Sequence, residues 1–174
     1  PDLTYQDYLD FHSKYYHPSN SYIYLYGDMD FAEKLEWIDK EYLSAYDAIT
    51  LDSAVKEQAA FEKPKEISFP YPIASSESLT DNTYLSYNTV VGNVLDKELY
   101  LAFEVLEYAL LNAPGAPLKK ALIDAGIGKD IMGSYDNGIY QPIFSIIAKN
   151  ANEEQKEEFL SVIRNVLEDC VKNG

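Results

Sequence analysis

The sequence predicts an α+β fold in which helices pack on one face of a mainly antiparallel sheet. Two short segments, Ser21 to Tyr26 and Thr83 to Val91, alternate in side-chain character from one residue to the next, as half-buried strands do. Longer segments repeat apolar residues at intervals of three and four, as amphipathic helices do. Asp136-Asn137-Gly138 lies between two β-type runs, and Asn-Gly there predicts a tight hairpin between antiparallel strands. This mixture of helices and antiparallel strands indicates two layers.

The first part of the chain is expected to form a helix, a strand and a second helix. Thr4 can cap the first helix, and Asp7 lies near the positive end of its dipole. Pro18 ends this helix, and the strand Ser21 to Tyr26 follows. The second helix begins at Asp28 or Asp30, and its apolar stripe consists of Phe31, Leu35, Ile38 and Tyr42.

Residues 48–65 are expected to link two structural units, 1–47 and 66–174. From Ser44 to about Pro64, small and charged residues alternate without an apolar face, as is typical of a linker. A short helix from Val55 to Phe61 is an alternative for part of this stretch.

The second unit is expected to begin with an extended arm or edge strand, Glu66 to Ile73, because its two prolines cannot donate to a ladder. The strand Thr83 to Val91 comes next. Asp96 then caps a helix that runs to Leu111 and is apolar on two sides. A helix of this kind is usually covered on both sides, so we expect it to be the centre of the core.

The remaining elements are a short helix, a hairpin and a last helix. The short helix runs from Leu118 to Ala125 and is followed by Gly126 and Gly128. The hairpin is expected to join strands at 129–135 and 139–149. Asn152 caps the last helix, whose buried face is expected to consist of Phe159, Ile163, Val166, Leu167 and Cys170.

The charge of the chain excludes two classes of partner. Fourteen Lys and Arg against 29 Asp and Glu leave a formal net charge of −15. This charge repels phosphate backbones and anionic headgroups, so we expect neither nucleic acid nor a membrane surface as a partner. No apolar run reaches the about 20 residues that a membrane helix needs.

Cys170 is the only cysteine, which excludes an internal disulfide and a cysteine-rich zinc site. The lack of disulfides and of a signal-like start favours the cytoplasm. The chain opens at Pro1 without a methionine and reads as a piece of a longer protein, so the compartment of the parent stays open.

No catalytic, cofactor-binding or metal-binding residues are predicted. His12 and His17 would lie about 140° apart on a helix, so they cannot hold one metal from one face. We expect His12 on or near the buried side of its helix. No G-x-S-x-G elbow supports a serine triad, and Gly126-x-Gly128 follows a helix rather than a strand. Cys170 lies on an apolar stripe and reads as a core residue.

Tyrosine is abundant, with 16 residues. Four of them can line a binding groove, although packing in and around a sheet is the simpler interpretation. These four are Tyr15, Tyr22, Tyr24 and Tyr26.

Two stretches of the chain resemble the insulinase (pitrilysin) family of inverted-motif zinc metallopeptidases, in particular its presequence-protease-like subfamily. The first is LTYQDYLDFHSKYYHPSNSYIYLYGDMD, which is similar to the helix, Tyr-His-Pro-Ser-Asn turn and Gly-Asp strand near the end of a family domain. The second is APGAPLKKALIDAGIGKDIMGSY, which is similar to a run early in a family domain. The resemblance covers most of the chain, with both parts in the expected order.

The resemblance implies a metallopeptidase-type fold and a non-catalytic role. The family motif H-x-x-E-H, with a further Glu downstream, is absent, and HSKYYH has neither its spacing nor its glutamate. The chain therefore matches the end of one family domain, a linker and the start of a second, non-catalytic domain. Its expected role is to help enclose the substrate chamber of a zinc peptidase. Its expected partners are the other domains of the parent and a peptide substrate.

Two alternatives stay open at this point. The chain can be an independent module whose tyrosine-rich surface binds a partner protein, or a scaffold segment of an inactive homologue. The sequence upstream of Pro1 would separate the peptidase interpretation from both alternatives: H-x-x-E-H there supports a peptidase, and its absence leaves the scaffold or binding interpretations.

A fragment of this kind exposes apolar surface that its missing halves would cover. We therefore expect the strand Ser21 to Tyr26 and the strand Thr83 to Val91 to share one sheet, within one chain or in a homodimer.

Overall fold

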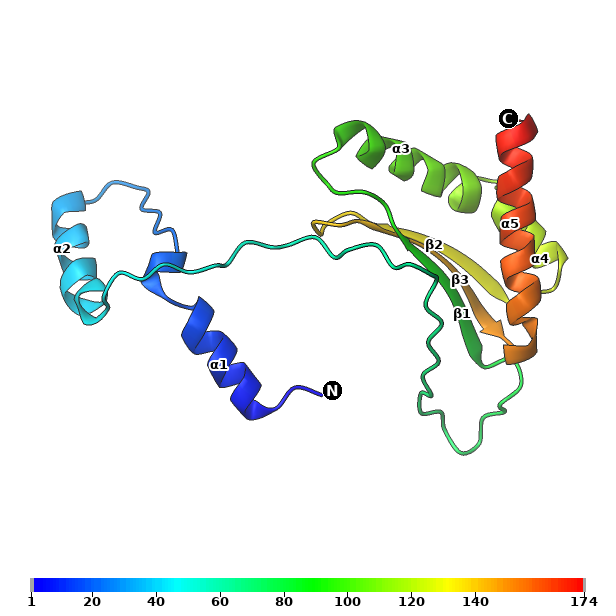
Figure 1. The fold of residues 1–174 in the computed structure, drawn as a ribbon, viewed down its shortest axis with the longest axis horizontal. Helices are drawn as coiled ribbons and strands as arrows, with labels where there is room; N and C mark the ends of the chain where they lie inside the picture. Colours follow the sequence, from blue (N-terminus) through cyan, green and yellow to red (C-terminus); the bar gives the residue numbers. More distant parts are fainter. Residues whose placement is uncertain (1, 174) are drawn as a thin grey trace. The chain divides into compact units, whose positions relative to one another are not determined.

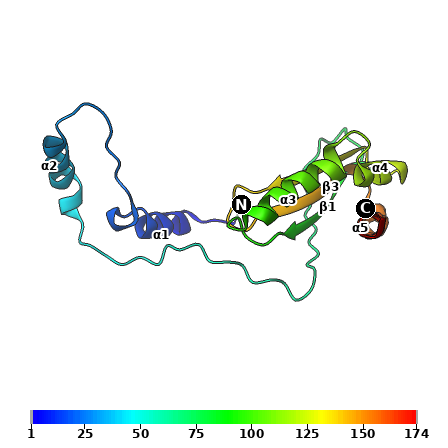
Figure 2. The ribbon, with the colours of Figure 1, turned by 90° about the horizontal axis from the view of Figure 1, so that it is seen from above.

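The computed structural model describes residues 2–173, and the chain divides into two units, 1–56 and 57–174. The first unit contains α1 (Tyr5–Tyr15), α2 (Phe31–Glu41) and short turns at Pro18–Asn20 and Leu43–Ala45 (Figure 1). The second unit contains a sheet and three α-helices (Figures 1 and 2). No helix within residues 2–173 is long and apolar enough to span a bilayer.

Both helices of the first unit begin where the sequence predicts. The Thr4 hydroxyl accepts a hydrogen bond from the Asp7 amide at 3.1 Å, and the Asp7 carboxylate accepts one from the Thr4 amide at 2.9 Å. Asp30 caps α2 by accepting from the Glu33 amide at 3.1 Å. These local bonds satisfy amides that a helix leaves unpaired at its first turn.

The predicted strand Ser21 to Tyr26 is wrong for this chain. The segment carries no strand, and the side chains of Tyr22, Tyr24 and Tyr26 are exposed. A strand needs a partner to pair its amides and carbonyls, and residues 2–56 contain no other strand. The expected sheet shared with Thr83 to Val91 is therefore absent within the described chain. Such pairing between two chains remains a prediction.

The first unit has no core of its own. None of the residues 2–56 is buried. The expected stripe of α2 is largely open to solvent, with Phe31 at 46% and Leu35 at 57% exposure. His12 is also exposed, contrary to expectation, because nothing described in this unit packs over that side of α1. The amphipathic helices have formed without the layer that would cover them.

The second unit is built on a three-stranded antiparallel sheet. Its strands are β1 (Thr83–Val90), β2 (Asp130–Asp136) and β3 (Ile143–Ala151), in the order β1-β3-β2. β3 is thus the central strand. The prediction of β1 is confirmed, and the mixed helix and antiparallel sheet confirm the predicted α+β class.

The hairpin between β2 and β3 is longer than the tight turn predicted. Asp136 pairs with Ile143, so residues 137–142 form the loop. Two carbonyls of this loop pair elsewhere: Tyr140 O accepts from the Val94 amide and Pro142 O from the Val91 amide, both at 2.9 Å. The chain that leaves β1 competes for these groups, and Pro142 itself has no amide to donate to β2.

Helices cover one face of the sheet. These are α3 (Lys97–Glu107), which continues as a π-helical turn at Tyr108–Asn112, α4 (Pro117–Asp124) and α5 (Lys156–Asn173). Figure 1 shows α3 along the sheet and α4 and α5 at one end of it. The buried cluster between these layers consists of Leu85, Val91, Leu111, Leu118, Leu122, Ile127, Ile131, Phe144, Ile146, Ala148, Ala151, Phe159 and Ile163.

The helix from Asp96 is capped as predicted, but its α-helical part is not the centre of this core; of the predicted helix, only Leu111 near its end is buried. Asp96 accepts from the Leu99 amide at 3.0 Å. No residue of α3 is buried, although Phe103 packs 5.8 Å from the Tyr135 ring and 5.7 Å from the Phe144 ring. Its second stripe is open, with Leu101 at 59%, Val105 at 67% and Tyr108 at 58% exposure. The outer cover that the sequence implied for α3 is absent from residues 2–173.

The extended parts of the linker region have no regular structure. The alternative helix at Val55 to Phe61 does not form, and 66–73 carries no strand. The prolines in this stretch explain the second result, because they cannot donate to a ladder.

A polar network joins the start of β1 to the start of α5. The Asp81 amide donates to Asn152 Oδ1 at 2.8 Å, and Asn152 Nδ2 donates to Asp81 Oδ1 at 2.8 Å. Lys129 Nζ lies 2.8 Å from Asp81 Oδ2. The predicted cap at Asn152 is therefore modified: its side chain binds Asp81, while the Gln155 side chain accepts from the Asn152 amide at 3.0 Å.

Leu122→Ala is expected to lower the free energy of unfolding by about 2–5 kcal/mol, because Leu122 is fully buried and its loss leaves a cavity. Leu106→Ala, at 41% exposure, is the matched control and is expected to cost about 1 kcal/mol or less. Urea unfolding followed by circular dichroism measures both. Equal shifts would show that the core does not lie where the structure places it.

Asp81→Asn is expected to destabilise the chain near neutral pH and to lose this effect in acid. The ion pair with Lys129 and the amide of Asn152 hold the pKa of Asp81 below its ordinary value of 3.8. A carboxyl with a lowered folded-state pKa stabilises the fold above its unfolded pKa, and this contribution disappears as pH falls through the folded pKa. The pair is partly exposed, so the shift in urea midpoint should be modest. A gap between the two proteins that stays constant well below pH 3.8 would contradict this account.

Candidate functional site

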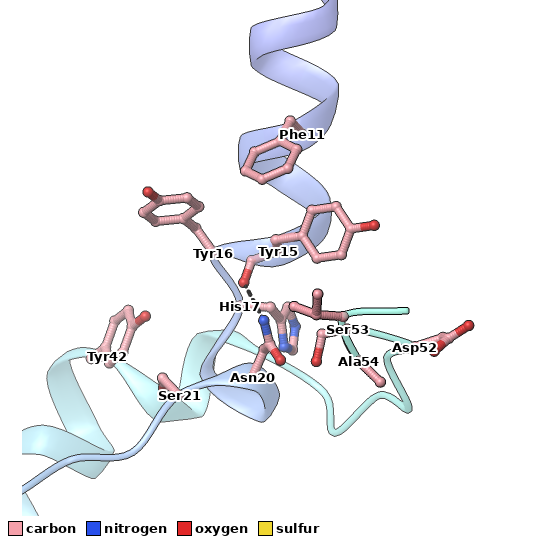
Figure 3. Close-up of a pocket in the computed structure, with 11 residues that line it drawn as sticks. Phe11, Tyr15, Tyr16, His17, Asn20, Ser21, Tyr42, Asp52, Ser53 and Ala54 are labelled. Atoms are coloured by element: carbon pink, nitrogen blue, oxygen red, sulfur yellow. Dashed lines mark hydrogen bonds between the residues drawn. The ribbon is translucent and has the colours of Figure 1, made fainter. Parts of the chain in front are cut away.

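The first unit carries an aromatic hollow of about 640 Å³. It lies between the end of α1, the turn after it, Tyr42 and the segment 52–55 (Figure 3). Asn20 Nδ2 donates to the Tyr15 carbonyl at 2.9 Å and fixes the turn against the helix end. The side chains that line the hollow include Phe11, Tyr15, Tyr16, His17 and Tyr42.

Two polar side chains of this hollow, His17 and Asp52, already have partners. His17 Nδ1 accepts from the Ser19 amide at 3.1 Å, and its ring packs edge-on against Tyr46 at 5.2 Å. The carboxylate of Asp52 pairs with Lys56 at 2.8 Å. The hollow can receive an apolar or aromatic group, but these side chains do not form a nucleophile and base pair.

The two histidines serve different local contacts. The His12 ring stacks on Tyr16 with centroids 4.4 Å apart and an interplanar angle of 14°. His17 belongs to the turn that follows. No cluster of three or more His, Cys, Asp or Glu side chains suited to a metal occurs among residues 2–173.

Cys170 is half-buried on α5, beside a shallow hollow between α4 and α5. The hollow also contains Lys120 and Asp124, which form an ion pair with each other on α4. The predicted place of Cys170 on the apolar side of the last helix agrees with this partial burial.

The second candidate surface is the face of the sheet that the helices leave open. Phe144, Ile146 and Ala148 of β3 point into the core, so the alternate residues of the sheet point to the other face. This open face carries Ser86, Asn88 and Val90 of β1, Met132 and Ser134 of β2, and Ile143, Ser145 and Ile147 of β3.

Polar side chains at the centre of the open face are hydrogen-bonded across strands. Asn88 Oδ1 accepts from Ser145 Oγ at 2.7 Å and from Ser86 Oγ at 3.0 Å. Ser134 lies directly opposite Ser145 on the neighbouring strand. Asn88 is exposed, and these two bonds use only its Oδ1 atom. The open face therefore presents hydroxyl and amide groups that a ligand can contact.

The face of the sheet that the helices cover includes one tyrosine with a shifted pKa, Tyr135. Burial raises the pKa of Tyr135, and the nearby Tyr100 and Glu104 raise it further. Its ring lies 5.8 Å from Phe103 and 6.2 Å from Tyr100. Tyr135 therefore stays neutral at ordinary pH and serves packing, not proton transfer.

The sequence did not lead us to predict the open face of the sheet as a candidate surface. Its signal was present in the alternation of β1, where Ser86 and Asn88 share one side. The serines of β2 and β3 join them only because of the register, which pairs Asn88 with Ser145 and Ser134 with Ser145. Of the four tyrosines for which a binding groove was the alternative to sheet packing, the structure places Tyr15 in the hollow and leaves Tyr22, Tyr24 and Tyr26 outside it.

The fold within residues 2–173 is an α+β segment with a helix-covered antiparallel sheet. A family model described as the peptidase M16 inactive domain matches residues 2–174. The chain belongs to this family, and its relatives place it in the insulinase type and the presequence-protease-like group. It is thus a non-catalytic segment of an M16-type protein.

Three relatives illustrate the likeness. Protein HypA of Clostridium perfringens (strain 13 / Type A) is 51% identical over 174 residues, which are 100% of this chain and 18% of that protein. Presequence protease 1, chloroplastic/mitochondrial, of Arabidopsis thaliana is 31% identical over 178 residues, with 100% of this chain and 16% of the relative covered. Presequence protease, mitochondrial, of Mus musculus is 25% identical over 177 residues, covering 100% and 17%. The chain therefore spans less than a fifth of the length of these relatives.

The residues present do not fit a catalytic zinc site. His17 uses one ring nitrogen to accept the Ser19 amide, His12 stacks on the Tyr16 ring, and Cys170 lies in the other unit. A catalytic zinc needs three protein ligands that converge on one point.

We predict that the 174-residue chain retains no stoichiometric zinc after dialysis against a chelator. Elemental analysis measures the bound metal in the wild type and in the double variant His12→Ala, His17→Ala. Zinc bound at one equivalent in the wild type and lost in the variant would contradict this prediction.

Proposed function

We propose that this chain forms part of the wall of a substrate chamber in a zinc metallopeptidase of the insulinase type. It contributes structure and a surface for peptides, while the catalytic groups belong to other parts of the parent. The observation that carries the proposal is the one-sided sheet: helices bury one face, and the other presents Ser86, Asn88, Ser134 and Ser145. Such a wall is packed against helices on its outer side, and its inner side presents these polar groups beside the apolar side chains Val90, Met132, Ile143 and Ile147.

The two units are best explained as parts of two different domains of the parent. Residues 1–47 would be the end of a first domain, 48–65 a linker, and 66–174 the start of a second, non-catalytic domain. The absence of buried residues from 2–56 supports this division, because an independent unit would bury an apolar core. The open stripe of α3 supports it as well, since a complete domain would cover it.

The extended segment Tyr22 to Tyr26 fits the same explanation. Its alternation favours a strand, yet it has no partner within residues 2–56. In the parent, we propose that it joins the sheet of the first domain, so that Ile23 and Leu25 are buried there. The tyrosines would then form one face of that strand.

The proposed zinc site belongs to another part of the parent protein. When bound at an H-x-x-E-H motif outside this chain, zinc activates the water that attacks the peptide bond. The role of the present residues is to enclose the peptide and exclude bulk solvent.

The test is an open-face substitution in the full-length parent protein. Ser134→Arg places a large cation on the proposed inner face, and we expect kcat/KM for a long peptide to fall by about tenfold. Val171→Arg is the matched control, because Val171 is 87% exposed on the outer helix α5. It should leave kcat/KM within about twofold of the wild type.

Two outcomes would overturn the proposal in different ways. If Ser134→Arg and Val171→Arg have the same effect, the open face does not line the chamber. If the full-length protein shows no chelator-sensitive peptide hydrolysis, the parent is an inactive homologue and the scaffold interpretation is preferred.

A further inference from the structure

β1 is an edge strand that lacks protection in its own sequence. Among residues 2–173, only β3 pairs with it, so its other edge has unpaired backbone groups. Its sequence, TYLSYNTV, contains no charged residue and no proline. An uncharged edge rich in β-branched and aromatic residues is a template for pairing with another chain.

The opposite edge of the same sheet is protected differently. β2 begins with Asp130 and ends with Asp136, and both side chains are exposed. Two copies of this strand would bring like charges together, which opposes edge-to-edge pairing. β1 carries no such charges, so another segment of the chain has to protect its free edge.

The segment Glu57–Tyr71 is tied to the molecule beside both ends of β1. Just after β1, the Glu57 carboxylate accepts from Asn93 Nδ2 at 2.9 Å. Gln58 is held by the Gln141 side chain through two bonds: the Gln58 amide donates at 2.6 Å, and the Gln58 carbonyl accepts at 3.1 Å. In Figure 1 the chain then passes along the sheet and loops back to the start of β1.

Near the start of β1, Tyr71 makes the other attachment. Its hydroxyl donates to the Asn82 carbonyl and lies 3.0 Å from Asn82 Oδ1, and its ring packs edge-on against Tyr84 at 5.7 Å. Between the two ends, Glu66 pairs with Lys156 at 2.6 Å, which raises the pKa of Lys156. All of these attachments use side chains, so the segment adds no strand to the sheet.

This segment has the charged residues and prolines that β1 lacks. It contains two prolines, which cannot donate to a ladder, and a set of charges that resists a neighbouring chain. These residues are Glu57, Glu62, Lys63, Pro64, Lys65, Glu66 and Pro70.

We propose that residues 57–71 form a strap that guards the free edge of β1 against pairing with β1 of a second copy. The strap keeps a charged, proline-containing chain beside an edge that would otherwise be open. Because side-chain bonds hold it at its ends, it can be released without unfolding the sheet.

Releasing the strap in the 174-residue chain tests this inference. The double variant Tyr71→Phe, Gln141→Ala removes the hydroxyl bonds to Asn82 and both bonds to Gln58, and the strap then keeps only the exposed Glu57–Asn93 bond and the Glu66–Lys156 ion pair. Its self-association constant, measured by sedimentation velocity over a concentration series, is expected to rise by about tenfold or more. The control Tyr108→Phe, Asn165→Ala changes exposed residues of similar chemistry outside the strap and should behave as the wild type.

A rescue substitution identifies the edge responsible. Thr89→Lys puts a charge on β1 and should return the released variant to the monomer. Hydrogen exchange in β1 should slow with concentration in the released variant, and not in the rescued one.

Two results would overturn the inference: a released variant that keeps its helical signal and stays as monomeric as the control, or an association that Thr89→Lys does not reverse. If the double variant loses its helical signal, Gln141→Ala alone, which changes only a loop side chain, replaces it in the same assay.

Discussion

The burial of one side of β3 is the interaction on which the ordered part of this chain depends. β3 pairs with both other strands, and its residues Phe144, Ile146 and Ala148 are at most 6% exposed. The helices contribute Leu118, Leu122 and Phe159 to the same cluster. Without this contact, the edge strands and the short helix α4 would bury too little apolar surface to stay folded. The first unit has no equivalent of β3, and its helices therefore stay uncovered.

Local signals in the sequence predicted the elements well, and the failures occurred where an element depends on a partner distant in the sequence. Thr4, Asp30 and Asp96 cap helices because a cap depends on neighbours within one turn. Ser21 to Tyr26 has a clear strand pattern, but a strand also depends on a distant partner, which this chain does not supply. The same reasoning applies to α3, whose two apolar sides were visible in the sequence although only one has a cover here.

The candidate surface was less predictable than the fold. Tyrosine is abundant in the sequence, yet only one of the four tyrosines considered as possible groove residues, Tyr15, lies in the hollow. The open polar face depends on the pairing of Ser145 with Asn88 and Ser134, which no local pattern reveals. The family model identifies the chain as an M16 inactive domain, and the role of this face as a peptide-contacting surface is our proposal.

The pairing between β1 and β3 has a consequence for how the second unit acquires its structure. The register joins Thr83 to Ala151, so β1 reaches its partner only after nearly all of the intervening chain has been made and ordered. The contacts among α4, β2 and β3 are much closer in sequence and cost less loop entropy to close. On a ribosome, β1 would therefore emerge early and wait as an unpaired, uncharged strand until β3 follows. A charged and proline-containing segment immediately ahead of it is well placed to keep this waiting strand from binding a neighbouring nascent chain.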